Sequence, residues 1–253
     1  MPLLTPEWSL PPGAQARFST RAGGVSKPPY TSLNLGDHVG DDPRAVFENR
    51  NILKTQLPSE PLWLKQTHGV VVSTPISRSL FQKVGIEADA AVTNVPNEVL
   101  VVMTADCLPV LFSSSNGEVV GVAHAGWRGL CGGVLESTMQ EILRLSTDLK
   151  PEDILVWLGP AIGPHAFEVG EDVVDAFCSD GLPIPPDAFV PIAGREGKYL
   201  ANLYLLARQR LLALGLKDIS GGTHCTYQEK EHFFSYRRDG LTGRFASFIW
   251  ISA

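Results

Sequence analysis

The sequence is poor in cysteine and histidine and has no long hydrophobic run. It holds four cysteines and six histidines among 253 residues. The longest apolar candidate, residues 99–112, is interrupted by Asp106 and Pro109, so it falls short of the roughly 18 apolar residues that a membrane span needs. We therefore expect no membrane partner.

Signs of export are also missing. The first fifteen residues, MPLLTPEWSLPPGAQ, contain prolines and a glutamate where a secretory signal has a basic start and an uninterrupted apolar core. The four cysteines are widely spaced, which favours reduced thiols over a disulfide framework. These features predict a cytoplasmic protein.

Positive charge is in deficit, with 21 lysines and arginines against 27 aspartates and glutamates and a net charge of −6. A broad electrostatic surface for nucleic acid is therefore not expected, although a local basic cluster can still bind a small anion. With 44% apolar and 19% charged residues, the chain has the composition of a globular protein with a sizeable core. The sequence does not choose between a monomer and a homodimer.

Strand and helix patterns occur side by side, and no internal repeat or Gly/Ser linker divides the chain. Residues 1–253 are therefore interpreted as a single domain of the α+β class. Helices are predicted at residues 43–57, 171–178 and 200–215, and a helical face follows residue 133. Strands are predicted at residues 14–20, 62–68, 87–93, 99–107, 108–112, 119–123 and 154–158, with a last hairpin turned at DGLTG, residues 239–243.

Two apolar runs end in reactive side chains. Residues 99–107 end in Cys107, residues 119–125 contain His124, and the SSSNGE turn between them predicts an antiparallel hairpin with both residues at its open end. A third apolar run ends at His68. One thiolate and two imidazoles can form an open zinc site at this rim. An inert buried thiol and hydrogen-bonded histidines would give the same pattern.

Glycines and basic residues suggest where an anion could bind. Glycines at 126, 129, 132 and 133 stand at the head of the helical face, where free N–H groups suit a phosphate, and Arg128 adds a fixed cation. Arg21 and Asn34 lie in a long polar loop over residues 21–42, a length typical of functional or disordered loops. A surface loop without a binding role is the alternative.

Three further charged positions have simple structural interpretations. Arg50 lies on the first predicted helix, where a solvated charge is the default. Arg237 belongs to a Ser-Tyr-Arg-Arg group that can hold an anionic or aromatic substrate or protect an edge strand. Glu87 and Asp89 open a predicted strand and are interpreted as solvated ends.

Several stretches stand out together: TRAGGVS, SLNLGDHVGDDP with ENR, LKQTHG, MTADCLPVLF, HAGWRGLCGGVLE, LGPAIGPHAFEVG and FFSYRRDGLTGRFASFIW. From about residue 17 to residue 251, and in the expected order, they resemble the laccase-domain, or YfiH-type, family of bacterial purine nucleoside phosphorylases. The resemblance implies a layered α/β/β/α fold and a zinc ion bound by His68, Cys107 and His124. It also implies phosphorolysis of adenosine, inosine and S-methyl-5′-thioadenosine, with adenosine deaminase activity.

The implied chemistry agrees with the residue types. Three protein ligands leave a fourth position on zinc open, and a thiolate with imidazoles suits zinc or copper(I) better than magnesium. Zinc lowers the pKa of bound water toward about 7, which rationalises deamination. For phosphorolysis we expect Cys107, His124 and Arg50 to be catalytic. Arg21 and Arg128 would help to orient the phosphate, with Arg50 favoured because it lies in ENR.

The family carries two older labels, copper-dependent polyphenol oxidase and editing of peptidoglycan precursors. Six scattered histidines cannot supply four coppers, which disfavours a multicopper laccase. A metal-free Cys107–His124 nucleophilic pair with Asp106 nearby would serve an amide or ester hydrolase and is the stronger rival. A nucleotide-binding protein without catalysis is the third class.

Overall fold

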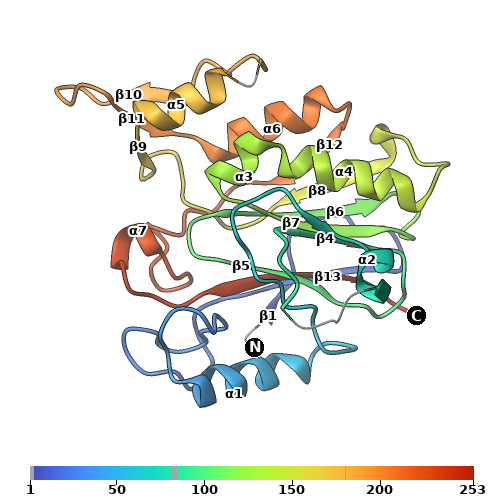
Figure 1. Ribbon diagram of the computed structural model, residues 1–253. Coiled ribbons are helices and arrows are strands. Elements are labelled where there is room, and N and C mark those ends of the chain that lie inside the picture. Colours follow the sequence, from blue (N-terminus) through green and yellow to red (C-terminus); the bar gives the residue numbers. More distant parts are fainter. Residues whose placement is uncertain (1–2, 81–84, 180) are drawn as a thin grey trace.

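The computed structural model describes residues 3–80, 85–179 and 181–253. Two large sheets pack face to face, and helices cover the outer face of each (Figure 1). Helix α1 (Pro43–Lys54) lies under one sheet, and helices α3 (Trp127–Gly132), α4 (Val134–Leu145) and α6 (Leu203–Ala213) lie over the other. The expected α/β/β/α layering and the α+β class are therefore confirmed.

The sheets are mainly antiparallel. The four-stranded sheet has the order β1 (Leu3–Leu4), β2 (Ala14–Ser19), β13 (Phe245–Ile251), β5 (Leu100–Thr104). The six-stranded sheet has the order β12 (Asp218–Gly221), β8 (Ile154–Leu158), β6 (Leu108–Ser114), β7 (Val120–Ala125), β4 (Ala90–Thr93), β3 (Val72–Ser73). A small projecting sheet contains β10 (Phe189–Pro191), β11 (Lys198–Ala201) and β9 (Glu168–Gly170) beside α5 (Glu171–Cys178).

Local signals place several of these elements where the sequence predicts them. Helix α1 begins at Pro43, whose missing N–H costs nothing there, and the Asp42 side chain accepts a hydrogen bond from the Arg44 amide. Strands β6 and β7 form the predicted antiparallel hairpin. The remaining short elements are α2 (Pro75–Leu80), α7 (Tyr236–Asp239) and a 3-10 turn (Pro151–Asp153). None of the described helices is long and apolar enough to cross a membrane.

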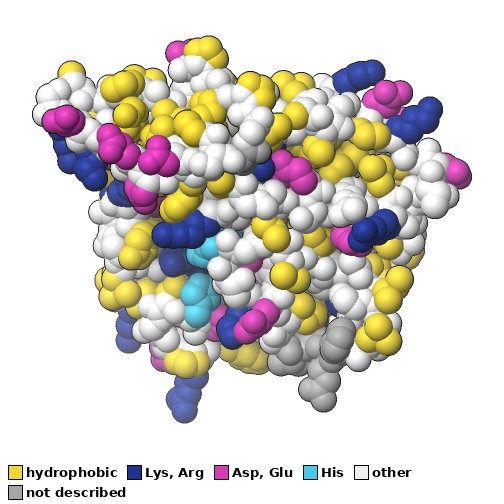
Figure 2. Space-filling view, turned by 45° about the horizontal axis from the view of Figure 1, so that its top comes forward, with side chains coloured by type: hydrophobic (Ala, Val, Ile, Leu, Met, Phe, Trp, Pro, Cys, Tyr) yellow, Lys and Arg dark blue, Asp and Glu magenta, His cyan; other side chains and the backbone are white. Residues whose placement is uncertain are grey.

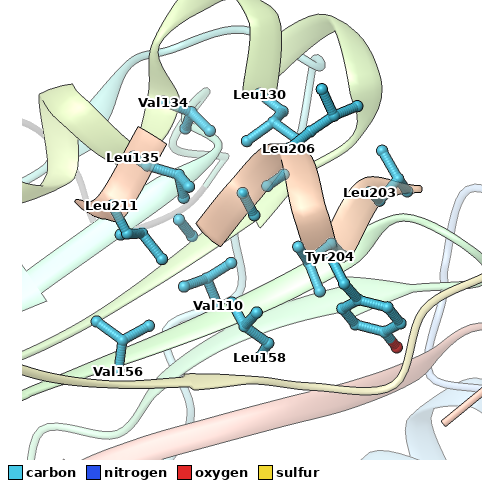
Figure 3. Close-up of a cluster of buried hydrophobic side chains, with 14 of the residues drawn as sticks. Val110, Leu130, Val134, Leu135, Val156, Leu158, Leu203, Tyr204, Leu206 and Leu211 are labelled. Atoms are coloured by element: carbon cyan, nitrogen blue, oxygen red, sulfur yellow. The ribbon is translucent and has the colours of Figure 1, made fainter. Parts of the chain in front are cut away.

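The core is divided by the sheets. Leucine and valine side chains of α3, α4 and α6 meet the outer face of the six-stranded sheet, as Figure 3 shows around Leu135, Leu206 and Val110. A second apolar layer, including Phe18, Leu111 and Phe245, fills the space between the two sheets. Burying one side chain of this size contributes about 1.5–3 kcal/mol to the free energy of folding. These layers therefore stabilise the sheets whose ends carry the candidate site.

Residues 62–68 do not form the predicted strand. Strand-type pairing of this stretch is limited to isolated bridges, Leu62 to Leu100 and Lys65 to Glu87, and the paired strand β3 begins at Val72. The prediction of a strand that ends at His68 is therefore wrong. Side chains accept several of the backbone N–H hydrogen bonds in and around this stretch. A hydrophobic pattern in the sequence does not reveal such bonds.

The predicted C-terminal hairpin is also absent. Residues 235–240 form α7 and its cap, and β13 pairs with β2 and β5 instead of folding back on a neighbour. Arg238 donates hydrogen bonds to the backbone oxygens of Thr226, Tyr227 and Phe233, which holds the segment before β13 against the preceding loop. Neither the hairpin nor its alternative, a charged edge strand, describes this segment.

Candidate metal centre and adjoining cavity

The β6–β7 ladder brings Cys107 and His124 together. Leu108 pairs with Ala125 and Pro109 pairs with His124, so Cys107, the residue before β6, lies at the same end of the hairpin as His124. This arrangement confirms the predicted neighbourhood of the two residues. The His124 side chain is almost fully buried, whereas Cys107 is partly accessible.

A tight turn fixes the direction of Cys107. Asp106 has a φ of 93°, which is unusual for a residue other than glycine. Its carboxylate accepts hydrogen bonds from the Thr226 hydroxyl (2.6 Å) and the Arg237 amide (2.6 Å), and its backbone oxygen accepts one from the Ile162 amide (2.9 Å). Three segments distant in sequence therefore hold the turn that presents the thiol.

His68 reaches the same place from a loop that one carboxylate organises. The Asp89 carboxylate accepts hydrogen bonds from the amides of Thr67 (3.1 Å), His68 (2.9 Å) and Gly69 (2.7 Å), and from the Thr67 hydroxyl (3.0 Å). His68 itself has a φ of 62° and an exposed side chain. The loop thus turns sharply around Asp89 and directs the imidazole toward Cys107.

Asp89 also holds the second imidazole. His124 Nδ1 lies 2.8 Å from Asp89 Oδ1, and with the proton on Nδ1 the Nε2 atom is left as a ligand. Burial raises the pKa of the Asp89 carboxyl, but the His124 and loop hydrogen bonds outweigh it and bring the pKa to about 2. The interpretation of Asp89 as a solvated end is therefore wrong, since it is fully buried, whereas Glu87 is exposed beside Lys65.

The three side chains fit a zinc ion. Their ligand atoms all lie within 4.8 Å of one another, and His68 Nε2 lies 3.8 Å from Cys107 Sγ. Tetrahedral zinc with its usual bond lengths would set a nitrogen and a sulfur ligand about 3.6 Å apart. Burial raises the pKa of the Cys107 thiol, but the imidazoles of His124 and His68 lower it to about 6, which favours the thiolate that a metal requires. Copper(I) would accept the same donors.

A cavity of about 130 Å³ opens beside the ligand thiol. Its wall is mostly aromatic and apolar and includes Cys107, Trp127, Ile162, Phe167, Tyr236 and Arg237. The Arg237 guanidinium lies 5.3 Å from the Phe167 ring centre and donates to the Glu168 backbone oxygen (2.7 Å). A flat, partly polar molecule is the natural occupant of such a space.

Of the arginines predicted to bind an anion, Arg237 and Arg128 lie at or next to this cavity, whereas Arg50 packs elsewhere. Arg237 lines the cavity, and the exposed Arg128 lies 4.3 Å from the ring centre of Trp127. Arg50 packs 4.0 Å from the Trp63 ring centre and donates to the Leu35 backbone oxygen. On the face shown in Figure 2, histidine side chains lie next to Lys or Arg side chains left of the centre.

Arg21 and Asn34 are engaged in loop structure. Arg21 lines a separate groove and donates to the backbone oxygens of Thr31 and Lys230. Asn34 is fully buried, and its amide group bonds to Gly36, Asp41 and the Arg244 amide. The polar loop is therefore internally braced, and the guanidinium of Arg21 is not one of the groups that line the cavity.

Comparisons with known proteins find relatives that match nearly the whole chain. A family model described as multi-copper polyphenol oxidoreductase laccase matches residues 15–252. A Haemophilus influenzae protein named purine nucleoside phosphorylase is 54% identical over 99% of each chain. The Escherichia coli purine nucleoside phosphorylase YfiH is 52% identical over 98% of each chain.

Solved structures of similar proteins share the fold. A Neisseria meningitidis protein of the DUF152 family superposes with a TM-score of 0.91 at 46% identity over 100% of both chains. A Bacillus licheniformis protein titled hypothetical protein YfiH superposes with a TM-score of 0.84 at 34% identity, covering 94% of this chain and 93% of its own.

Proposed function

Because the chain belongs to the family described as multi-copper polyphenol oxidoreductase laccase, and its relatives include purine nucleoside phosphorylases, we propose that it is a zinc-dependent purine nucleoside phosphorylase. Adenosine, inosine and S-methyl-5′-thioadenosine are its proposed substrates, with adenosine deaminase activity in addition. The observation that carries the proposal is the ligand trio of His68, Cys107 and His124 beside an aromatic cavity.

The cavity supports the choice of a purine. Trp127, Phe167 and Tyr236 offer apolar and aromatic surface on which a base can stack, and Arg237 supplies hydrogen-bond donors at its edge. In this arrangement the base enters the cavity and the ribose remains near Cys107. A zinc ion held by the trio, with copper as the alternative, supplies a Lewis acid at that position.

Phosphorolysis requires a phosphate at the ribose. A phosphate oxygen forms a bond to C1′, the bond from C1′ to the purine nitrogen breaks, and the leaving purine takes up a proton. We expect Arg128 and Arg237 to orient the anion or the base, since Arg237 lines the cavity and Arg128 packs against Trp127, which also lines it. Arg50, Arg21 and Asn34 act in this proposal through the loop that they brace.

Product analysis tests the proposal. The zinc-loaded protein is incubated with adenosine with and without phosphate, and adenine, inosine and hypoxanthine are separated by chromatography. Phosphate-dependent adenine release supports phosphorolysis, and inosine formed without phosphate supports deamination. Cys107→Ala should abolish both, and the exposed Cys178→Ala is the matched control. A wild-type protein that releases no adenine would refute the phosphorylase.

A metal-free cysteine hydrolase is the second candidate, favoured by the lowered pKa of Cys107 and its 3.8 Å approach to His68 Nε2. Asp106 would not complete a triad, because its carboxylate is bonded to Thr226 and the Arg237 amide, whereas Asp89 orients His124. Metal analysis of freshly purified protein separates the two. Stoichiometric zinc lost on Cys107→Ala supports the phosphorylase, and a metal-free enzyme inactivated by thiol alkylation supports the hydrolase.

A multi-copper oxidase fits the donor set less well. In the part of the chain that the structure describes, one cluster of three potential metal ligands is found. Four coppers would need several such groups, so the copper-dependent polyphenol oxidase of the family description is not the function that we propose.

A further inference from the structure

One arginine of this chain, Arg238, binds both oxygens of a neighbouring carboxylate. Arg238 anchors Nη1 on the backbone oxygens of Thr226 (2.7 Å) and Tyr227 (2.9 Å). The other edge of its guanidinium, Nε and Nη2, donates to the two carboxylate oxygens of Asp239 at 2.9 and 2.7 Å. Carboxylate and phosphate both match this fork of parallel donors.

Arg244 is anchored on backbone oxygens through Nη1 as Arg238 is, but its Nε–Nη2 edge has no carboxylate partner among the described residues. Its Nη1 donates to the backbone oxygens of Thr242 (3.1 Å) and Gly243 (3.0 Å), which sets the plane of the guanidinium. Its Nε and Nη2 atoms donate to no group in residues 3–80, 85–179 and 181–253, and Arg244 forms no ion pair with a carboxylate there. Partial burial removes water from the Arg244 guanidinium, and an anion bound to its Nε and Nη2 donors would offset that desolvation penalty.

Strand pairing places this fork at the candidate metal centre. Phe245 on β13 pairs with Thr104 on β5, so Arg244 lies at the sheet end from which the chain runs on to Asp106 and Cys107. Burial lowers the pKa of Arg244, whereas the negative charges of Cys107 and Asp106 raise it, which agrees with the position of Arg244 at this end of the sheet. Asp106 does not pair with it, because both carboxylate oxygens are bonded elsewhere.

The polar loop holds Arg244 in this position. Asn34 Oδ1 accepts the Arg244 amide (2.8 Å), and the Leu35 amide donates to the Arg244 backbone oxygen (3.0 Å). Gly36 allows the side chain to lie close, since a Cβ there would come within 2.8 Å of Arg244 Cγ. Arg50 bonds to the Leu35 oxygen from the other side, so it positions the loop rather than offering the same free fork.

We propose that Arg244 binds the phosphate co-substrate through its Nε–Nη2 edge, at the sheet end that leads to Cys107 and next to the residues that line the cavity. This inference rests on the proposed phosphorolysis, for which it names the group that holds the anion. Arg50 and Asn34 are then positioning residues, and Arg128 and Arg237 serve the base side.

Phosphate titration of zinc-loaded variants tests the assignment. Arg244→Met removes the fork and keeps most of the stem, Arg244→Lys keeps the charge without the fork, and Arg44→Met on exposed α1 is the matched control. We expect the KM for phosphate to rise at least about tenfold in Arg244→Met and less in Arg244→Lys, with the nucleoside KM within about twofold. Zinc content and thermal stability should stay close to wild type in Arg244→Lys.

Binding of inorganic phosphate alone, followed by calorimetry, separates this inference from the proposed function. Phosphate binding by the wild type that is weakened in both Arg244 variants supports the site even if no nucleoside is cleaved. Phosphorolysis with an unchanged phosphate KM in both variants would leave the function standing and overturn the role of Arg244. A wild-type protein that does not bind phosphate overturns it too, as would equal losses in Arg44→Met.

Discussion

The two histidines of the candidate metal centre are positioned in opposite ways. His124 is a buried residue of a central strand, and its ring is fixed by the ladder around it and by the Asp89 carboxylate. His68 is an exposed loop residue with a positive φ, and its backbone, rather than its ring, is fixed by the same carboxylate. The comparison teaches that one ligand is built into the sheet and the other is attached to it through Asp89.

The largest effects are expected when either imidazole is removed, because both variants should lose zinc binding but only one should lose stability. His68→Ala and His124→Ala should each weaken zinc binding by more than about 100-fold, since each loses a ligand. Only His124→Ala should unfold readily, because it leaves the buried Asp89 charge without its ring partner at a cost of roughly 3–5 kcal/mol. Elemental analysis and urea unfolding measure the two effects. Stoichiometric zinc in His68→Ala, or equal stabilities of the two variants, would break the comparison.

Replacing Asp89 should affect both histidines at once. Asp89→Asn weakens the hydrogen bonds to the His68 loop and to His124 Nδ1, so we expect zinc affinity to fall by about 10–100-fold. Competition with a chelating dye measures the affinity. The control is the exposed Glu87→Gln, which should bind zinc as the wild type does. A loss confined to stability, with zinc affinity unchanged, would show that Asp89 does not tune the ligands.

The pH dependence of Cys107 alkylation in the metal-free protein tests whether both imidazoles act on the thiol. Because the imidazoles of His124 and His68 lower the pKa of Cys107 to about 6, the thiolate should form as the pH rises through about 6. Alkylation by iodoacetamide, followed by mass spectrometry, should therefore rise between about pH 5 and 7, whereas an ordinary thiol would react mainly above about 8. A profile centred above 8 would contradict the prediction.

The smallest effect is expected at Thr67. Its hydroxyl donates one of the bonds to Asp89 (3.0 Å), while its amide donates another from the backbone. Thr67→Val should cost about 1 kcal/mol and lower zinc affinity only a few-fold. Urea unfolding and dye competition measure both quantities, with the exposed Thr55→Val as a control. A loss as large as that of Asp89→Asn would mean that the hydroxyl alone orders the loop.

The hairpin that carries Cys107 and His124 could be predicted because its information is local. Two continuous apolar runs and the turn between them predict β6 and β7, and their antiparallel pairing brings Pro109 opposite His124. Family resemblance and the residue types then added His68. The α+β class was predicted from the mixture of strand and helix patterns, whereas the layered α/β/β/α arrangement was implied by the family resemblance.

The parts that could not be predicted depend on side chains reaching distant backbone. Asp89 replaces strand pairing around His68, which lies 21 residues away in sequence, and a buried carboxylate is indistinguishable from a solvated one in a sequence. Arg238 similarly satisfies backbone oxygens and removes the expected hairpin. Arg244 was not singled out because its unpartnered donors become apparent only when every neighbouring acceptor is placed.

The β6–β7 register makes the distance between Cys107 and His124 independent of the connection that joins their strands. Extra residues inserted at the exposed tip, between Ser115 and Asn116, would leave both ligands at the same end of the hairpin. A single residue inserted inside β7 would instead turn His124 to the other face of the sheet. The tip is thus a place where a reporter peptide can be grafted without disturbing the chemistry, and the strand interior is not.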